Sequence, residues 1–402
     1  MKVGYVLMQF PVPSEVFVSN DIKELARKKI DVSVFALKGY HKDHSKLIKE
    51  RGLEGIDQST FHSRAIVSGC WEMILNLDLT IVLLGKVIRN SMGDFKNMFK
   101  CLVLLPPSFF VFREIRKQKI DIVHLYWGHF PSLVGLLIKQ KSPWTVVTIS
   151  LSAYDLVMAL GISKKMVLVA DRVFTWARQN INDIKSWGVK ENRITLVYQS
   201  LDLSKIPFAP HHLNEANSFK ILSAGRLIQE KSFEDVMRVF SILSEKFPTA
   251  QLSVAGDGPD RGRLEELAGQ LTLSENVVFL GHISHSTLLE KLKDSPVFLF
   301  MSSYKGERLP NVVKEAMANG CFCVSTNTKG MEELIQDGQN GFLVEYHDYE
   351  KAATILTQFF INPEKFIGIR KQARKTIENN FDIEKSMQLM IDTWNQLKNS
   401  QC

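Results

Sequence analysis

Residues 297–326 form the stretch that decides the fold: VFLFMSSYKGERLPNVVKEAMANGCFCVST. An apolar run, Val297–Met301, is followed by a polar loop and then by a helical segment over Asn311–Asn319. This segment follows a proline and precedes a glycine, residues that favour the first turn of a helix and the position after its end. A second apolar run, Cys321–Ser325, completes a strand–helix–strand unit. Such near-continuous apolar strands predict a parallel sheet covered by helices on both faces.

The same alternation of strands and helices continues on both sides of this stretch. A polar passage with prolines and histidines interrupts it after residue 203. We predict an α/β protein with two doubly wound, Rossmann-like domains at residues 1–203 and 219–380, a linker at 204–218, and a C-terminal amphipathic helix within 381–402. The other expected strands are Val3–Met8, Asp31–Leu37, Ile120–Leu125, Trp144–Ile149, Arg172–Thr175, Phe219–Ala224, Gln251–Ala255, Asn276–Leu280 and Gly341–Val344.

Composition excludes disorder, collagen-like repeats and a disulfide-stapled miniprotein, since 45% of the 402 residues are hydrophobic and 23% are charged. Residues 1–200 hold 28 Lys and Arg against 17 Asp and Glu, whereas residues 201–402 hold 22 against 26. A basic half and a mildly acidic half suggest different partners. An anionic membrane surface, nucleic acid and acidic small molecules are all open for the basic half.

We expect a cytoplasmic protein without a signal peptide or a membrane span. The N-terminal run reads as a first strand, and the longest nearly apolar stretch, Cys101–Phe112, is too short to cross a bilayer. The five cysteines form no C-x-x-C pair, so neither a zinc site nor a disulfide framework is indicated. Cys321 and Cys323 are expected to be buried thiols in a strand.

Between Ile74 and Leu102, apolar residues recur every three or four positions, which indicates one face of a helix, with a break at Gly93-Asp94. Residues 81–119 hold eight basic and two acidic side chains. Two interpretations stay open: a packed helix with a solvated basic edge, or an interfacial helix against anionic lipid.

The expected ends of the second-half strands carry the candidate chemistry, because ligands of open α/β sheets bind beyond those ends. Arg226 and Lys231 lie on one strand-to-helix loop and suit phosphate oxygens. The next loop contains Gly256 and Gly258, either as a structural turn or as a ligand loop.

The helix after Pro310 presents free backbone N–H groups, a ready site for a diphosphate. Glu307 lies just before this helix and Glu315 lies within it. Carboxylates accept hydrogen bonds from sugar hydroxyls, so one suits a nucleotide ribose and the other a sugar ring. Together with the two cations, they predict a pocket for a nucleotide diphosphate sugar.

At this point the second half resembles the retaining glycosyltransferases of the GT-B fold, family 4. The shared motifs, in order and in register over about 130 residues, are Gly225-Arg226-Leu227 with Lys231, Gly256-Asp257-Gly258-Pro259, Val278-Phe279-Leu280-Gly281, Glu307 with Glu315-Ala316-Met317-Ala318, Gly330 with Glu333, and Asp337-Gly338 with Gly341. Ser232 and Arg308 depart from it where the family usually has Gly, and Phe322 where it usually has Pro.

The resemblance implies two domains facing a cleft, with the C-terminal helix crossing back onto the first domain. It implies that Glu315 binds the ribose, that Glu307 faces the donor sugar and that Arg226 and Lys231 hold the diphosphate. The donor-binding residues predicted with them are Leu309, Asn311, Val312, Gly256, Gly258 and His282.

The first half is similar to a subgroup that builds bacterial extracellular polysaccharide and lipopolysaccharide, through Pro13–Phe17, Asp121–His124 and Trp127-Gly128. Relatives usually carry a His near the donor's anomeric centre where this chain has Ser152, which we assign to the catalytic set. Glu15, His124 and Asp155 are the candidate acceptor residues, although a lone His at a strand end is often a structural hydrogen-bonding residue.

The expected reaction is transfer of a sugar from a nucleotide diphosphate donor to a carbohydrate acceptor, with retention at the anomeric carbon, and we expect this acceptor to be lipid-linked. The chain has no Asp-x-Asp, so we expect neither a metal nor another cofactor. Peripheral attachment to the cytoplasmic membrane face is a further expectation. The alternatives are a non-catalytic sugar-nucleotide or partner-binding protein, an epimerase or phosphorylase of similar fold, and a nucleic-acid-binding protein, for which no motif speaks.

Overall fold

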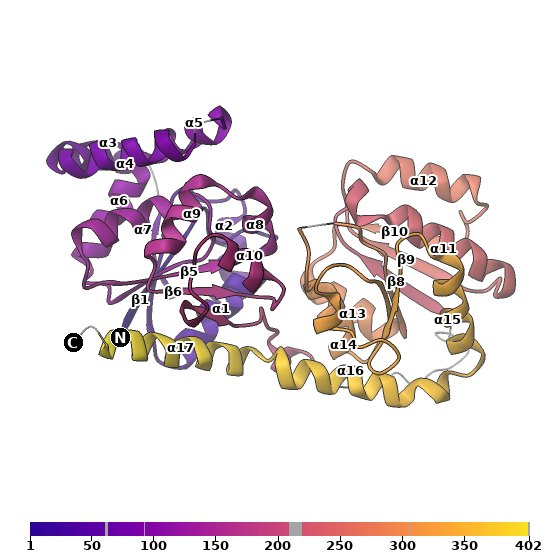
Figure 1. The fold of residues 1–402 in the computed structure, drawn as a ribbon. Helices are drawn as coiled ribbons and strands as arrows, with labels where there is room; N and C mark the ends of the chain where they lie inside the picture. The colour runs from indigo at the N-terminus through magenta and orange to yellow at the C-terminus, as the bar shows by residue number, and fades with distance from the viewer. Residues whose placement is uncertain (61–62, 92, 209–218, 305, 401–402) are drawn as a thin grey trace. The chain divides into compact units, whose positions relative to one another are not determined.

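The computed structural model describes residues 1–60, 63–91, 93–208, 219–304 and 306–400 (Figure 1). Its internal contacts divide the chain into two compact units: Met1–Gln199 with Ile383–Cys402, and Ser200–Asp382. The sequence predicts these boundaries at residues 203 and 381, within four residues of those in the structure. Residues 209–218 of the expected linker lie outside the described residues.

The first unit is built on a seven-stranded parallel sheet of order β3-β2-β1-β4-β5-β6-β7. The order reverses direction between β1 and β4, which creates a crevice at the carboxyl ends of these strands. The α/β, doubly wound architecture expected from the sequence is confirmed. Its strands are β1 (Lys2–Leu7), β2 (Asp31–Ala36), β3 (Asp57–Thr60), β4 (Ile122–Leu125), β5 (Val146–Leu151), β6 (Arg172–Thr175) and β7 (Ile194–Leu196).

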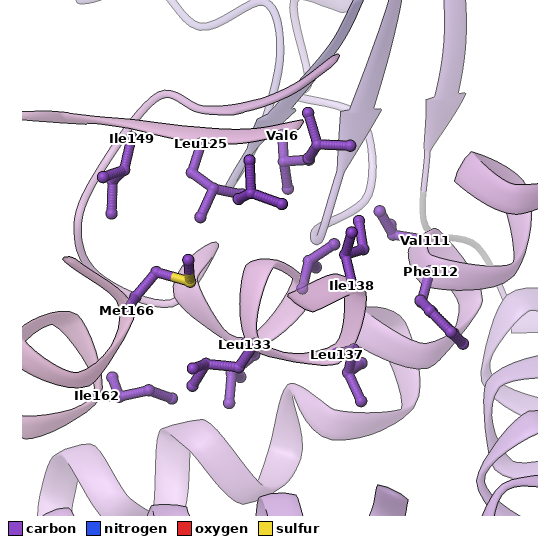
Figure 2. Close-up of a cluster of buried hydrophobic side chains, with 14 of the residues drawn as sticks. Val6, Val111, Phe112, Leu125, Leu133, Leu137, Ile138, Ile149, Ile162 and Met166 are labelled. Atoms are coloured by element: carbon purple, nitrogen blue, oxygen red, sulfur yellow. The ribbon is translucent and has the colours of Figure 1, made fainter. Parts of the chain in front are cut away.

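Helices cover both faces of this sheet. On one face, Leu125 and Ile149 of the sheet meet Leu133 and Met166 of the helices in a buried apolar cluster (Figure 2). The helices of this unit are α1 (Val16–Arg27), α2 (His44–Arg51), α3 (Ser63–Leu75), α4 (Leu77–Asn90), α5 (Phe95–Val103), α6 (Leu105–Lys117), α7 (Ser132–Lys141), α8 (Ala153–Met158), α9 (Gly161–Val169), α10 (Asn180–Ser186) and α17 (Ile383–Asn399), with 3-10 turns η1 (Glu191–Arg193) and, at the start of the second unit, η2 (Leu203–Lys205).

Helix α17 packs on the other face of the first sheet. Its Trp394 is fully buried and donates its indole N–H to the hydroxyl of Thr148 on β5, at 3.2 Å. Near its C-terminal end, Lys398 Nζ lies 2.9 Å from Asp121 Oδ1. A buried tryptophan of this size contributes about 3–5 kcal/mol to stability, so the last helix is an integral part of the first unit.

The apolar stripe from Ile74 to Leu102 is not a packed helix face, so that interpretation is wrong. The chain bends by 101° between Ala65–Leu75 and Leu77–Asn90, and breaks again before Phe95 as the sequence indicated. At the first break, the Asn76 side chain donates to Glu72 and so competes with the helix backbone. Most stripe residues are exposed, Phe95 by 74%.

No single helix in the described ranges is both long and apolar enough to cross a membrane. Among the residues that the structure describes, the bent pair Ala65–Leu75 and Leu77–Asn90 reaches that length and composition together.

The second unit has a six-stranded parallel sheet of order β10-β9-β8-β11-β12-β13, which reverses direction between β8 and β11. Cys321 and Cys323 are buried beside or within β12, as expected, and burial raises the pKa of the Cys321 thiol to about 12. The elements are β8 (Lys220–Ala224), η3 (Gln229–Lys231), α11 (Phe233–Lys246), β9 (Gln251–Ala255), α12 (Arg261–Gln270), β10 (Val277–Gly281), α13 (His285–Asp294), β11 (Val297–Phe300), α14 (Asn311–Ala318), β12 (Phe322–Thr326), η4 (Met331–Glu333), β13 (Phe342–Val344), α15 (Tyr349–Ile361), η5 (Pro363–Phe366) and α16 (Ile367–Asn380).

Candidate functional site

Two loops meet at the point where the second sheet reverses direction. One connects β8 to α11 and carries Arg226 and Lys231; the other connects β11 to α14 and carries Glu307. The backbone N–H of Ser303 donates to the carbonyl of Glu230 at 2.9 Å, which ties the loops together. The crevice expected beyond the strand ends is therefore lined from both sides by charged residues.

Lys231 and Glu307 form an ion pair across this junction. Lys231 Nζ lies 2.5 Å from Glu307 Oε2, and the two side chains are only 11% and 18% exposed. Ser302 donates a second hydrogen bond to the same carboxylate oxygen, at 3.2 Å. The ammonium also lies over the rings of Phe300 and Tyr304, 5.5 and 5.8 Å from their centroids. These contacts hold one cation and one carboxylate in fixed positions.

Arg226 remains exposed and forms no ion pair with any residue in the described ranges. It is therefore free to bind an anion. Ser232 lies six residues after Arg226 and has a positive φ of 49°, a backbone conformation that favours glycine. Ser232 does not cap α11 through its side chain; its hydroxyl instead lies 2.9 Å from that of Ser303.

Gly256 and Gly258 allow the β9–α12 loop to lie directly against the β8–α11 loop. A Cβ on Gly256 would lie 1.8 Å from the carbonyl oxygen of Gly225, and one on Gly258 would lie 2.3 Å from that of Leu227. The glycine loop is thus required as a structural turn. It positions the backbone on either side of Arg226.

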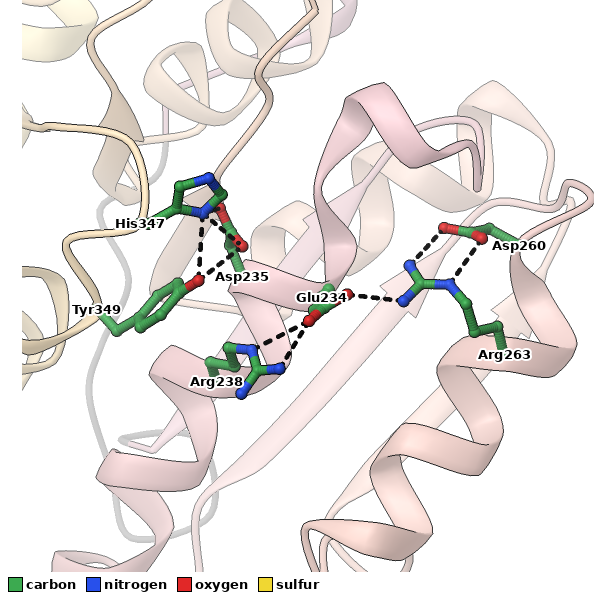
Figure 3. A network of polar contacts seen from close by, with 7 residues as sticks. All are labelled: Glu234, Asp235, Arg238, Asp260, Arg263, His347 and Tyr349. Carbon is green, nitrogen blue, oxygen red and sulfur yellow. Dashed lines mark hydrogen bonds and ion pairs between the residues drawn. The ribbon is translucent and has the colours of Figure 1, made fainter.

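A network of polar contacts fixes the helices behind these loops (Figure 3). Arg263 on α12 lies between Asp260 and Glu234, at 2.9 and 2.7 Å, and so joins the starts of α12 and α11. His347 and Tyr349, near the start of α15, both contact Asp235 of α11. Because these pairs are partly exposed, each adds at most about 1 kcal/mol, but together they fix the direction of α11.

Glu315 lies on α14 with 7% of its surface exposed. Its carboxylate accepts a hydrogen bond from His285 Nε2 at the start of α13, at 2.9 Å. His285 was not among the predicted site residues; the pair joins two helices 30 residues apart in the sequence, and only the fold brings them together. Asn311 lies one turn before Glu315 on the same face.

The buried Oδ1 of Asn311 has no hydrogen-bond partner among the described residues. Leaving a buried polar atom without a hydrogen-bond partner costs free energy of folding. This position at the start of α14 therefore suits a ligand that donates a hydrogen bond to Oδ1. Leu309 and Val312 flank it and are half-buried, whereas His282 is exposed just after β10. The structure thus brings Lys231 to Glu307 and Asn311 to Glu315.

In the first unit, two predicted acceptor residues are structural. His124 is fully buried, its ring nitrogens lie 2.9 Å from the Thr148 hydroxyl and 3.1 Å from that of Ser150, and burial lowers its pKa to about 3. Asp155 is buried and accepts the backbone N–H of Gly128 at 3.0 Å. Neither side chain is available to an acceptor in this structure.

Ser152, predicted as catalytic, forms a capping box with Asp155 at the start of α8. Each side chain accepts a backbone N–H from the other, and the Ser152 hydroxyl donates to the Asp155 carboxylate at 2.8 Å. The spacing Ser-x-x-Asp is typical of the start of a helix, and this signal in the sequence indicates a structural role for both residues. Burial raises the pKa of Asp155 to about 6, against the lowering effect of these hydrogen bonds.

Glu15 is the predicted acceptor residue that remains half-buried at the carboxyl edge of the first sheet. Burial raises its pKa to about 7, although nearby Arg51 and a hydrogen bond from Trp127 oppose this rise. Aromatic rings that are not among the predicted site residues surround Glu15. Trp127 follows β4 and Trp176 follows β6; their centroids lie 5.3 Å apart, and Phe17 packs against both.

Residues 207–380 match the family model described as "Glycosyl transferases group 1". An uncharacterized glycosyltransferase of Haemophilus influenzae is 24% identical over 73% of this chain and 74% of its own length. The putative colanic acid biosynthesis glycosyltransferase WcaL of Escherichia coli is 23% identical over 95% of this chain and 96% of its own.

Among solved structures, HepE of Anabaena in complex with UDP superposes with a TM-score of 0.73 at 17% identity, covering 98% of this chain and all of that one. At this identity the likeness concerns the fold alone. Residues 207–380 are therefore similar to the group 1 glycosyltransferases, and the two sheets of the chain have the GT-B fold.

Proposed function

We propose that this glycosyltransferase moves a sugar from a nucleotide diphosphate donor to a hydroxyl of a glycan, with the anomeric configuration retained. The observation that carries the proposal is the Lys231–Glu307 pair at the β8/β11 reversal, next to the exposed Arg226 and the start of α14. Cations, helix N–H groups and a carboxylate are the groups that such a donor requires at its diphosphate and sugar.

Arg226, Lys231 and the N-terminal end of α14 would stabilise the charge that grows on the departing diphosphate. Each group that stabilises a developing oxyanion in this way increases the rate by a factor of about 10²–10³. Lys231 is held by Glu307 in this structure, so donor binding exchanges part of that ion pair for contacts with phosphate oxygens. No metal is needed in this scheme, because the chain supplies the positive charge.

Glu307 would face the donor sugar and Glu315 the ribose. A ribose edge presents two hydroxyls, and the Glu315 carboxylate, already oriented by His285, has a free oxygen to accept from them. Asn311, one turn earlier, offers its unpartnered Oδ1 to the nucleotide. HepE was solved with UDP and with UDP-glucose, which supports a uridine nucleotide as the first donor to try.

The acceptor would bind at the carboxyl edge of the first sheet, around Glu15, Trp127 and Trp176. Aromatic faces pack against the apolar face of a sugar ring, and a carboxylate accepts its hydroxyls. The name of WcaL supports a role in assembling a bacterial surface polysaccharide, for which a lipid-linked glycan is the natural acceptor. We place the reaction on the cytoplasmic side.

A donor screen followed by product analysis tests this function. UDP and a panel of sugar nucleotides should raise the melting temperature of the purified chain by mass action. The stabilising donor should then be consumed with a glycan acceptor, in the presence of EDTA, to give a product whose anomeric signal in NMR matches the donor. Binding without turnover against any glycan would indicate the non-catalytic alternative, and an inverted product would refute retention.

A further inference from the structure

Helix α3 exposes apolar side chains on its outer side, where a surface helix is usually polar. Its inner side, against α6, carries Gly69 and the buried carboxylate Glu72. A Cβ on Gly69 would lie 2.0 Å from the carbonyl oxygen of Pro106, so α3 rests directly on the α6 backbone. Among the side chains of α3 that the structure describes, the exposed ones are apolar residues and one cysteine: Ile66, Val67, Cys70, Trp71, Ile74 and Leu75. A water-facing helix normally has the opposite arrangement.

Helices α4 and α5 extend this apolar surface. In α4 the buried residues Leu79, Leu83 and Val87 pack inward, while other apolar side chains remain outside. In α5, Phe95 and Phe99 are 74% and 67% exposed. We call the exposed set the apolar patch: Ile66, Val67, Trp71, Ile74, Leu75, Leu77, Ile81, Val82, Ile88, Phe95, Phe99 and Val103. These helices lie on the outer side of α6 and α7 (Figure 1).

The patch has a basic border. Arg89, Lys96 and Lys100 are exposed on α4 and α5 and form no ion pair with any residue that the structure describes. Exposed Arg116 and Lys117 follow at the end of α6. Within the described part of α3 to α5, there are three carboxylates: Glu72 is buried, whereas Asp78 and Asp94 are exposed, and Asp94 caps α5. The border therefore attracts a negatively charged surface.

We propose that the apolar patch docks this protein in the plane of an anionic lipid bilayer. Trp71, Phe95 and Phe99 would enter the headgroup–acyl boundary, and the basic border would face the lipid phosphates, as in interfacial amphipathic helices. The 101° bend between α3 and α4 suits helices that lie on a membrane. A second copy of the chain is a poorer occupant, because pairing two patches would bring two basic borders together. The donor site takes no part in this inference.

Vesicle flotation tests the proposal with the full chain. We expect binding to vesicles of phosphatidylcholine mixed with phosphatidylglycerol, and weaker binding to phosphatidylcholine alone or at high salt. Phe95→Ser with Phe99→Ser should lower the vesicle affinity at least tenfold. Each of Lys96→Glu and Lys100→Glu should lower it at least about fivefold, since one basic residue near the surface contributes about that factor.

Trp144→Ser is the matched control, because Trp144 is 73% exposed in the same unit but lies outside the patch. It should float like the unchanged chain, and all variants should keep the melting temperature and the donor-induced stabilisation of the unchanged chain. Failure to bind anionic vesicles would overturn the proposal. So would sedimentation that shows a stable dimer which the Phe95→Ser, Phe99→Ser variant loses, since the patch would then be a contact between copies.

Discussion

The two sheet edges where strand order reverses are built from different kinds of residue. At the second edge, Arg226, Lys231 and Glu307 are charged groups on loops, and Arg226 has no ion-pair partner in the described ranges. At the first edge, Ser152 and Asp155 satisfy each other in a capping box. The second edge thus leaves one cation, Arg226, exposed, whereas the first uses several of its polar groups to hold its own backbone.

This difference fits the two proposed ligands. The exposed cation Arg226 suits an anionic diphosphate, while half-buried rings such as Trp127 and Trp176 with one carboxylate, Glu15, suit a neutral sugar. The following variants separate the two edges by the quantity that each should change: kcat or the donor KM at the second edge, and stability at the first.

The largest effect is expected for Lys231→Ala. Loss of this cation removes charge stabilisation from the leaving diphosphate and frees the Glu307 carboxylate to repel it. We expect kcat to fall about 10²–10³-fold, measured by release of the nucleotide from the donor found in the screen.

Lys139→Ala provides the matched control for that substitution. Lys139 Nζ lies 2.9 Å from Asp171 Oδ2, and these side chains are 17% and 21% exposed, similar to the site pair. It should change stability by about 1 kcal/mol or less and leave kcat near that of the unchanged chain. Equal kcat losses in both variants would mean that the Lys231 pair acts only as structure.

The second effect is a loss of stability in Asp155→Ala. The substitution removes the capping box and leaves the buried N–H of Gly128 without its acceptor. We expect the free energy of unfolding to fall by about 2 kcal/mol, measured by urea denaturation. Ser152→Ala should cost about 1 kcal/mol, with kcat retained in the folded fraction; a hundredfold loss of kcat would restore Ser152 to the catalytic set.

The second edge was predictable from the sequence because its parts are local. Each loop follows its strand directly, so the cation, glycine and carboxylate positions could be placed within a motif such as Gly225-Arg226-Leu227. The parallel sheets were equally accessible, because buried strands leave continuous apolar runs. The bounds of the expected strands differ by at most two residues, as at Ile122–Leu125 and Val146–Leu151, whereas the short strands β3 and β7 at the edges of the first sheet were not expected.

The first edge was less predictable because its groups come from distant segments. The partners of His124 on β5 and the rings around Glu15 depend on which strands are neighbours. Periodicity indicated the helices between Ile74 and Leu102 but not which side of them is covered. Apolar spacing is the same whether the stripe meets a core or another apolar medium.

A smaller effect is expected for Glu15→Gln, and it depends on pH. The folded chain holds the Glu15 proton up to a pKa of about 7, whereas the ordinary value is 4.5. Between these values the native state binds more protons than the unfolded state, so stability falls as pH rises. Glutamine removes this penalty. The variant should be more stable than the unchanged chain by on the order of 1 kcal/mol at about pH 8, and by less at about pH 5, in thermal unfolding at both values.

The smallest effect is expected for His285→Ala at the second edge. His285 does not touch the proposed donor; it positions the Glu315 carboxylate through one hydrogen bond of 2.9 Å. Its removal should raise the KM for the sugar donor about three- to fivefold, which corresponds to the free energy of one partly exposed hydrogen bond. It should leave kcat nearly unchanged. His285→Gln, whose amide can donate to the same oxygen, should restore KM. Recovery of the KM in His285→Gln is the decisive measurement. A purely structural loss at α13 would lower kcat and stability, and the hydrogen-bond donor that glutamine supplies would not reverse it.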